Sequence, residues 1–265
     1  MTPREPSLVS MESVQEKAIR ILRREGALSL VRKGLRFLYL EWIRPRLPAR
    51  EVYYNGLPVP AGRLFDSVAR PWVGPKNRPN YEAELVDALE RHVTEGDTVT
   101  VVGGGWGVTA VTAAKETGAS GSVTVYEGAK RSVDRVSIVI ERNDVSDWVN
   151  VEHAVVAQGD HLYGPAGDAD RISPTDLPTC DVLELDCEGA ELDILRRMKI
   201  RPRVIAVETH RHLGVPVEEV EQILNNRSYD IRSRNPLNAD NGVYVIVAVS
   251  NAERRTDDSG DGSLS

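Results

Sequence analysis

Cysteines and long apolar runs are both scarce in this chain of 265 residues. The two cysteines, Cys180 and Cys187, are too few for a disulfide framework, and their spacing matches no zinc motif. No apolar run reaches the roughly 18 residues that span a bilayer, and the first residues lack the basic and then apolar layout of a secretory signal. We therefore expect a soluble, cytoplasmic protein. Because 41% of the residues are hydrophobic, a sizeable core remains possible.

Positive charge is scarce outside one stretch. Residues 14–50 hold ten Lys or Arg and three Asp or Glu, a charge of +7. The whole chain has 33 basic and 40 acidic residues, so the remainder holds 23 and 37, a charge of −14. Nucleic-acid binding needs a basic face that displaces counterions, so the acidic body argues against a nucleic-acid partner.

Four zones follow from composition. Residues 1–50 form a basic, helical extension, and residues 51–79 form a connector rich in proline and glycine. Residues 80–250 carry regular helix and strand patterns, and residues 251–265 form a polar, acidic tail without apolar periodicity, which we expect to be disordered.

Helical and strand patterns alternate through the third zone, which calls for a doubly wound parallel sheet with helices on both faces. The last two strand patterns are joined by too few residues for a crossover helix, so they should form an antiparallel hairpin. The expected helices are 81–93, 108–117, 131–142, 190–198 and 217–225, and the expected strands are 98–102, 122–126, 149–156, 181–185, 203–207, 229–234 and 243–249.

A glycine-rich turn follows the first of these strands, with glycines at 103, 104, 105 and 107. Such a turn suits a tight bend in any fold, but it also lets the backbone approach a ligand and leaves helix N–H groups free. A dinucleotide fingerprint needs Gly or Ala at position 108, which is Val108. The tighter spacing Gly103-x-Gly105-x-Gly107 is typical of S-adenosylmethionine sites, and no P-loop lysine is present.

Glu127 ends the next strand, 24 residues after Gly103. A carboxylate at this edge can accept hydrogen bonds from both hydroxyls of an adenosine ribose. An exposed strand end without a ligand is the alternative interpretation, and NAD is the competing cofactor.

The segment Asp186-x-Glu188-Gly189-Ala190-Glu191-Leu192 combines a strand end, an acidic turn and the start of a helix. With Tyr81-Glu82, the glycine turn, Tyr126-Glu127 and the run 206–210, it resembles the FkbM family of S-adenosylmethionine-dependent methyltransferases. The resemblance covers about residues 80–249. It departs from the family at Val101, where an acidic residue is usual two positions before the first glycine, and at Gly105, where asparagine is usual.

The resemblance implies a class I methyltransferase fold, a Rossmann-like and mostly parallel sheet, with S-adenosylmethionine as cofactor. It implies transfer of a methyl group, usually to oxygen, on a sugar, glycan or other small metabolite. The implied cofactor-binding residues are Gly103, Gly104, Gly105 and Gly107 for the methionine part, Glu127 for the ribose, and Ala154 and Val155 for the adenine. The implied catalytic residues are Asp186 and Glu188, beside methyl donor and acceptor.

The proton acceptor is open among several side chains near strand ends. His210 stands two residues after the expected end of a strand and titrates near neutral pH, so His210 or Asp186 is our candidate base. His210 and His212 are equally well explained as polar loop residues. Oxygen-rich side chains here could instead hold a divalent metal, but they also suit the start of a helix, so we do not favour a metal site. These side chains are Asp186, Glu188, Glu208 and His210.

The basic extension contains an amphipathic stretch in which Leu35, Leu38 and Trp42 share a face beside basic side chains such as Arg32 and Arg36. Such a stretch could lie peripherally on an anionic membrane. A helical cap on the main domain or a dimer contact are the alternatives, and the sequence leaves the oligomeric state open.

Three functions remain in view at this point. The first is an S-adenosylmethionine-dependent methyltransferase. The alternatives are an NAD-dependent oxidoreductase, which Val108 disfavours, and a catalytically impaired cofactor-binding or scaffold protein, which the departure at Val101 suggests.

Overall fold

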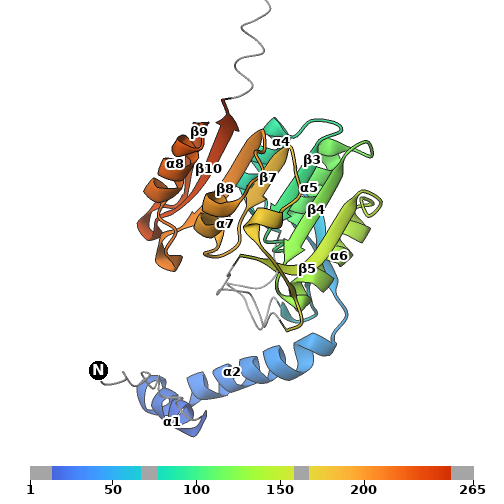
Figure 1. Cartoon of the computed structure of the whole chain (residues 1–265). Helices are drawn as coiled ribbons and strands as arrows, with labels where there is room; N and C mark the ends of the chain where they lie inside the picture. Colours follow the sequence, from blue (N-terminus) through green and yellow to red (C-terminus); the bar gives the residue numbers. More distant parts are fainter. Residues whose placement is uncertain (1–13, 67–76, 158–166, 252–265) are drawn as a thin grey trace, which may run out of the picture. The chain divides into compact units, whose positions relative to one another are not determined.

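The computed structural model describes residues 14–66, 77–157 and 167–251 (Figure 1). Two compact units divide the chain, one within residues 1–52 and 61–76 and the other within residues 53–60 and 77–265. The chain passes between them in the hairpin of β1 (Arg50–Tyr54) and β2 (Leu57–Gly62). Apart from Asn251, the predicted acidic tail lies outside the described residues.

The first unit contains two helices, α1 (Val14–Glu25) and α2 (Ala27–Leu38). Gly26 separates them with φ 85°, a conformation that glycine adopts without strain. After α2 the chain winds into a π-helical turn, Tyr39–Ile43, and a 3-10 turn, Arg44–Arg46. The described part of the N-terminal stretch is therefore helical, with a break at one glycine.

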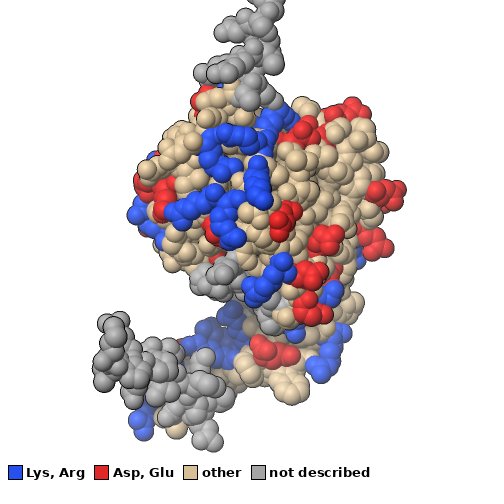
Figure 2. Space-filling model, viewed as in Figure 1, with Lys and Arg blue, Asp and Glu red and all other residues tan. Residues whose placement is uncertain are grey.

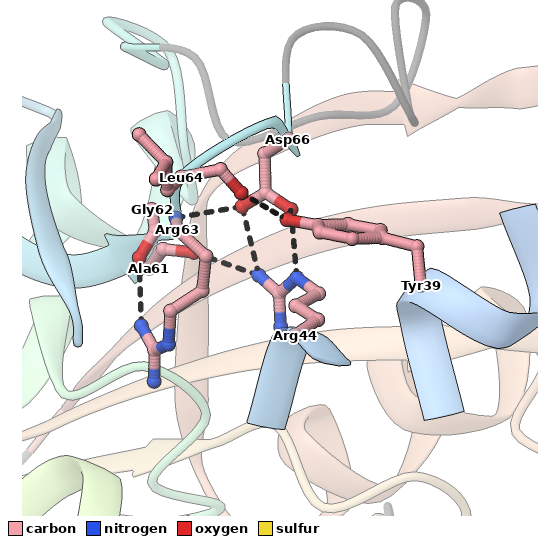
Figure 3. A network of polar contacts seen from close by, with 7 residues as sticks. All are labelled: Tyr39, Arg44, Ala61, Gly62, Arg63, Leu64 and Asp66. Atoms are coloured by element: carbon pink, nitrogen blue, oxygen red, sulfur yellow. Dashed lines mark hydrogen bonds and ion pairs between the residues drawn. The ribbon is translucent and has the colours of Figure 1, made fainter. Parts of the chain in front are cut away.

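A buried carboxylate, Asp66, ties the end of these helices to the segment after β2 (Figure 3). Arg44 Nε donates to Asp66 Oδ1 at 2.8 Å, and the Tyr39 hydroxyl donates to the same oxygen at 2.9 Å. The Arg63 N–H donates to Asp66 Oδ2 at 2.7 Å. Burial opposes the ionised carboxylate, but the hydrogen bonds from Arg44 and Tyr39 outweigh it and lower the pKa of Asp66.

The second unit is built on an eight-stranded sheet with the order β6-β5-β4-β3-β7-β8-β10-β9. The strands β3 to β8 pair in parallel, whereas β10 is antiparallel to both β8 and β9. The strands are β3 (Thr98–Val102), β4 (Ser122–Glu127), β5 (Val149–Val156), β6 (Asp170–Ile172), β7 (Val182–Leu185), β8 (Val204–His210), β9 (Tyr229–Asn238) and β10 (Val243–Ser250).

Helices cover both faces of this sheet (Figure 1). Three pack side by side on one face, and two pack together on the other. The first group is α4 (Ala83–His92), α5 (Val108–Thr117) and α6 (Lys130–Arg142), and the second is α7 (Glu191–Arg197) and α8 (Val217–Asn226). The core between the layers consists mainly of valine, leucine and isoleucine, which suit strands buried on both faces.

The predicted fold class is confirmed, including the antiparallel hairpin at the end: the sheet has the doubly wound layout of a class I methyltransferase. Several bounds differ from prediction, among them β9, which runs to Asn238, and α4, which begins at Ala83. The short strand β6 was not predicted, and β8 continues to His210, where a loop was expected. β10 pairs along the whole of β8, with Val243 opposite His210, and this pairing extends the strand beyond its apolar run.

Within the described residues, no helix combines the length and the apolarity that crossing a membrane requires.

Candidate functional site

The carboxyl ends of the parallel strands enclose a cavity of about 390 Å³ in the second unit. This is the edge at which doubly wound sheets bind ligands. Of the predicted site residues, seven line the cavity: Gly103, Gly105, Glu127, Ala154, Val155, Asp186 and Glu188.

Gly103 brings the glycine turn into backbone contact with the end of β7. Its φ is 104°, and a Cβ atom added to it would lie 1.9 Å from the carbonyl oxygen of Asp186. The N–H of Gly103 donates to the carbonyl of Tyr126 at 2.9 Å, which fixes the turn to β4 as well. Only glycine fits here, because any side chain would collide with backbone.

Gly105 faces the cavity and the side chain of Glu82. A Cβ atom at position 105 would lie 3.1 Å from Glu82 Oε1 and 3.7 Å from the Tyr81 hydroxyl. Gly104 and Gly107 do not line the cavity, since Cβ atoms there would point at Val136 instead. These two glycines shape the turn, and their predicted contact with a cofactor remains a prediction.

Glu127 is 6% exposed and closes the other side of the turn. Its Oε2 accepts from the Gly104 N–H at 3.1 Å, and its Oε1 accepts from the Ala129 N–H at 2.8 Å. A carboxylate has about four acceptor positions, so this one can still accept two hydrogen bonds from a ligand in the cavity. Ala154 and Val155, in β5, supply apolar wall beside it.

A second cavity of about 300 Å³ adjoins the first. Four residues line both cavities: Tyr81, Glu82, Asp186 and Glu188. The second cavity is completed by Glu208, His210, Leu237 and Val243. A molecule in one cavity therefore meets a molecule in the other at two strand-end acids, Asp186 and Glu188.

His210 is a buried strand residue, which corrects both the expected position two residues beyond a strand and the interpretation as a loop residue. Its Nε2 lies 3.2 Å from Glu208 Oε1 and 3.8 Å from Asp186 Oδ1. Its Nδ1 lies 3.4 Å from Glu191 Oε1. His212, by contrast, is exposed in a 3-10 turn and lines neither cavity.

Glu191 holds the acidic turn together while it faces His210. It is fully buried, and its two oxygens accept from the Cys187 N–H at 3.2 Å and from the Gly189 N–H at 2.8 Å. The carboxylate therefore fixes the loop that carries Glu188, and it also lies 3.4 Å from the imidazole Nδ1.

The pKa values of His210 and Asp186 are both raised. Burial disfavours a charged imidazole, but the hydrogen-bonding carboxylates of Glu191 and Glu208 outweigh it and raise the pKa of His210 to about 10. Burial and repulsion from Glu208 raise the pKa of Asp186 well above its ordinary value. His210 is thus cationic at neutral pH, not the group titrating near neutrality that the sequence suggested, and burial with the nearby carboxylates favours the protonated form of Asp186.

Glu82 and Glu188 are held at a conformational cost. Their φ values are 50° and 54°, in the left-handed region, where a residue other than glycine is disfavoured by about 1–2 kcal/mol. Burial also raises the pKa of Glu82 to about 7. Strain and perturbed titration at residues that line both cavities are typical of a functional site.

Val101, where the resembled family usually has an acidic residue, lies beside an acidic residue of the neighbouring strand. Val101 is buried, and its register partner on β7 is Glu184. Glu184 is fully buried, accepts from the Thr109 hydroxyl at 3.4 Å, and has a pKa raised well above its ordinary value by burial and by Asp186. Burial and the neighbouring Asp186 therefore favour the protonated form of Glu184, whereas the pKa of Glu82 is about 7.

Asp186, Glu188 and His210 can each point one ligand atom within 4.8 Å of the others, so a divalent ion would fit geometrically. A metal would have to displace the proton of His210, because only neutral imidazole is a ligand. The raised pKa of His210 opposes this, so we still do not favour a metal.

Sequence reasoning missed several residues of the site. Glu82 belonged to the family resemblance but had no assigned role, and Glu191 had none either. Trp106 lies beneath the Arg135 guanidinium, which is 4.3 Å from the ring centroid, and it meets Tyr54 edge-on at 5.6 Å. The Tyr81-Glu82 pair before a helix was the available signal, but Trp106 and Arg135 carried none.

No family model matches the chain, and no curated protein matches it. Solved structures with a similar fold include a SAM-dependent O-methyltransferase from Thermotoga maritima, with 16% identity and a TM-score of 0.46 over 77% of this chain and 78% of that one. A ribosomal protein L11 methylase from Lactobacillus delbrueckii subsp. bulgaricus has 17% identity and a TM-score of 0.45 over 63% and 77%. An O-methyltransferase from Bacillus cereus in complex with SAH has 11% identity and a TM-score of 0.43 over 63% and 81%. At such scores the likeness identifies neither reaction nor substrate.

Proposed function

We propose that this protein is an S-adenosylmethionine-dependent O-methyltransferase whose acceptor is a sugar, glycan or other small metabolite in the second cavity. The observation that carries this proposal is the pair of adjoining cavities, with Asp186 and Glu188 on their shared boundary. The glycine turn and Glu127 favour the first cavity as the donor site. The class of acceptor rests on the FkbM resemblance.

Charge favours this donor. When bound, S-adenosylmethionine supplies an electrophilic methyl group on a sulfonium, and its α-ammonium is a second cation. Glu82, beside Gly105, would pair with the ammonium, and Arg135, whose Nη1 lies 3.4 Å from the Gly105 carbonyl, would meet the donor's carboxylate. Glu127 would hold the ribose hydroxyls, with Ala154 and Val155 against the adenine.

Asp186 would take the proton from the acceptor hydroxyl. It lines both cavities, so it can reach an acceptor hydroxyl, and its raised pKa makes its ionised form a stronger base. Cationic His210, 3.8 Å from Asp186 Oδ1, would then hold that carboxylate toward the boundary. Glu191 and Glu208 keep the imidazole in place.

The competing NAD reading fits this charge pattern less well. The diphosphate of a dinucleotide is anionic, and acidic residues outnumber basic ones along the same cavity, with Glu82, Glu127, Asp186 and Glu188 against Arg78 and Arg135. A ligand with a cationic end is attracted there, whereas a diphosphate is repelled.

Calorimetric titration of the full chain separates these possibilities. We expect S-adenosylhomocysteine to bind and NAD not to bind, and the reverse would overturn the proposal. Next, methyl-labelled S-adenosylmethionine is incubated with the protein and a small-molecule extract. A labelled small-molecule product that forms only when the protein is present supports catalysis. Donor binding without such a product supports a catalytically impaired cofactor-binding protein.

A further inference from the structure

The helix α2 has no buried residue, although half of its residues are large and apolar. Nine of the thirteen large apolar side chains that the described chain leaves exposed lie between positions 19 and 43. Exposure on this scale marks a surface that binds a partner. Five of these side chains recur at alternating spacings of three and four residues and form one face, the leader face: Leu28, Val31, Leu35, Leu38 and Trp42.

Basic side chains flank the leader face. Arg32 and Arg36 are one turn apart on α2 and lie next to this stripe on the helix surface, and both are exposed. Among the described residues, Arg32 acts on Glu25 only through the longer-range attraction that helps to lower the pKa of that carboxylate, and neither arginine lies within ion-pair distance of a carboxylate. Lys33 pairs with Glu25 at 2.5 Å, so the positive charge of α2 is only partly balanced.

Basic side chains elsewhere are balanced differently. Figure 2 shows Lys and Arg gathered on the side of the sheet unit that carries α7, with most Asp and Glu toward α6. Arginines of α7 are nevertheless paired, Arg196 with Glu219 and Arg197 with Asp193. The combination of incompletely balanced positive charge and exposed apolar side chains is therefore a property of α2 and the turn that follows it.

The polar network of Figure 3 anchors the turns that follow α2 within the first unit. Tyr39 and Arg44 turn inward to Asp66, so these side chains have partners. The apolar side chains of the leader face, by contrast, stay exposed among the described residues.

We propose that α2 docks on an anionic membrane surface, with the leader face in the boundary between headgroups and acyl chains and Arg32 and Arg36 on lipid phosphates. The helix has 12 residues, about 18 Å long, so it can lie in the interface but cannot span a core of about 30 Å. A second copy of the chain is the less suitable partner, since both copies would bring the same positive charge. The docking does not depend on the proposed methyl transfer.

Flotation of the full-length protein with vesicles tests this proposal. We expect flotation with phosphatidylcholine vesicles that contain phosphatidylglycerol, weak flotation with phosphatidylcholine alone, and release by salt. R32Q/R36Q should weaken partitioning about 30-fold, about five-fold per charge, whereas K115Q/R131Q, an equal change on exposed residues of the sheet unit, should not. L28Q/L35Q should weaken it about 100-fold, and I138Q serves as its control.

Circular dichroism checks that the variants keep their helices. Absence of flotation in the wild type, or equal flotation with neutral vesicles, overturns the proposal. A lipid-free dimer that L28Q/L35Q dissociates, without flotation of the wild type, assigns the leader face to a second copy and overturns it as well.

Discussion

The two cavities at the sheet edge have walls of different kinds. The first is lined by the backbone of a glycine turn, by alkyl side chains of β5 and by Glu127. The second takes its charged wall from Glu82, from the turn after β7 and from β8, and it takes an apolar wall from Leu237 and Val243 in the β9–β10 hairpin. A wall of backbone atoms suits a ligand that is the same in every reaction. A wall of side chains can be altered by substitution without disturbing the glycine turn. Changes to the first cavity should therefore affect donor affinity, and changes to the second should affect turnover.

The largest effect is expected from Gly103→Ala, since the new Cβ would lie 1.9 Å from a backbone carbonyl. We expect the free energy of unfolding to fall by more than about 3 kcal/mol, measured by urea denaturation. Gly34→Ala is the control, because position 34 is helical with open space around it. A Gly103→Ala protein of normal stability would contradict the contact between the turn and β7.

Asp186→Asn should abolish most turnover and little binding. Loss of a general base lowers kcat by about 10²–10⁴-fold, while calorimetry should show affinity for S-adenosylhomocysteine within about ten-fold of the wild type. Asp193→Asn, on the outer side of α7, is the matched control. If Asp186→Asn lowered the affinity for S-adenosylhomocysteine as much as kcat, the two cavities would not have separate roles in donor binding and turnover.

Glu127→Ala should show the opposite pattern. We expect the affinity for S-adenosylhomocysteine to fall by roughly 1.5–3 kcal/mol, the contribution of a charged hydrogen-bonding group, with kcat retained at saturating donor. Because Glu127 also holds the Gly104 and Ala129 N–H groups, Glu127→Gln is measured beside it. Glu152→Ala on β5 is the control, and unchanged affinity in both Glu127 variants would exclude the ribose role.

Glu82→Gln should raise stability and change how donor binding depends on pH. The raised pKa means that the folded protein holds a proton more tightly than the unfolded chain, so stability falls as pH rises from about 4.5 to about 7. The variant should be more stable than the wild type by about 1–3 kcal/mol at pH 8 and similar to it at pH 4.

Donor binding supplies the second readout for Glu82. Wild-type affinity for S-adenosylhomocysteine should rise between pH 5.5 and 7 as Glu82 ionises, and binding should release protons to the buffer. Glu82→Gln should lose both effects, whereas Glu90→Gln, an exposed change on the same helix, should keep them. Proton release that persists in Glu82→Gln would exclude this carboxylate as the partner of the ammonium.

The smallest effect is expected from removal of divalent ions. Because carboxylates face both ring nitrogens of His210 and raise its pKa, its proton should resist replacement by a metal. EDTA should leave donor affinity and methyl transfer unchanged. Activity lost in EDTA and restored by Mg²⁺ or Mn²⁺ would assign the boundary carboxylates to a metal.

The sequence predicted the first cavity better than the second for a physical reason. Strand β3 and helix α5 begin and end at the predicted residues, since a β-branched run, a glycine turn and Gly118 delimit them. The glycine turn and Glu127 are separated by one helix and belong to adjacent strands, so local patterns place them together. The walls of the second cavity come from positions 81 to 243, and no local pattern joins such distant segments.

His210 shows how tertiary pairing overrides a local signal. Glu208, Thr209 and His210 are polar, which is typical of a loop after a buried strand. Their partners on β10 extend the ladder, and burial brings His210 between Glu191 and Glu208. The left-handed backbone of Glu82 and Glu188 was equally invisible, because neither residue type signals that conformation.

The antiparallel hairpin at the margin of the sheet makes acceptor choice separable from the rest of the molecule. β9 is the last strand, paired on one side only, and the connection between β9 and β10 lies beside Leu237 and Val243. Under the proposed function, a library that randomises this connection should change which acceptor is methylated and leave donor binding in place. Natural selection has the same freedom, so relatives with unlike products should diverge first at this hairpin.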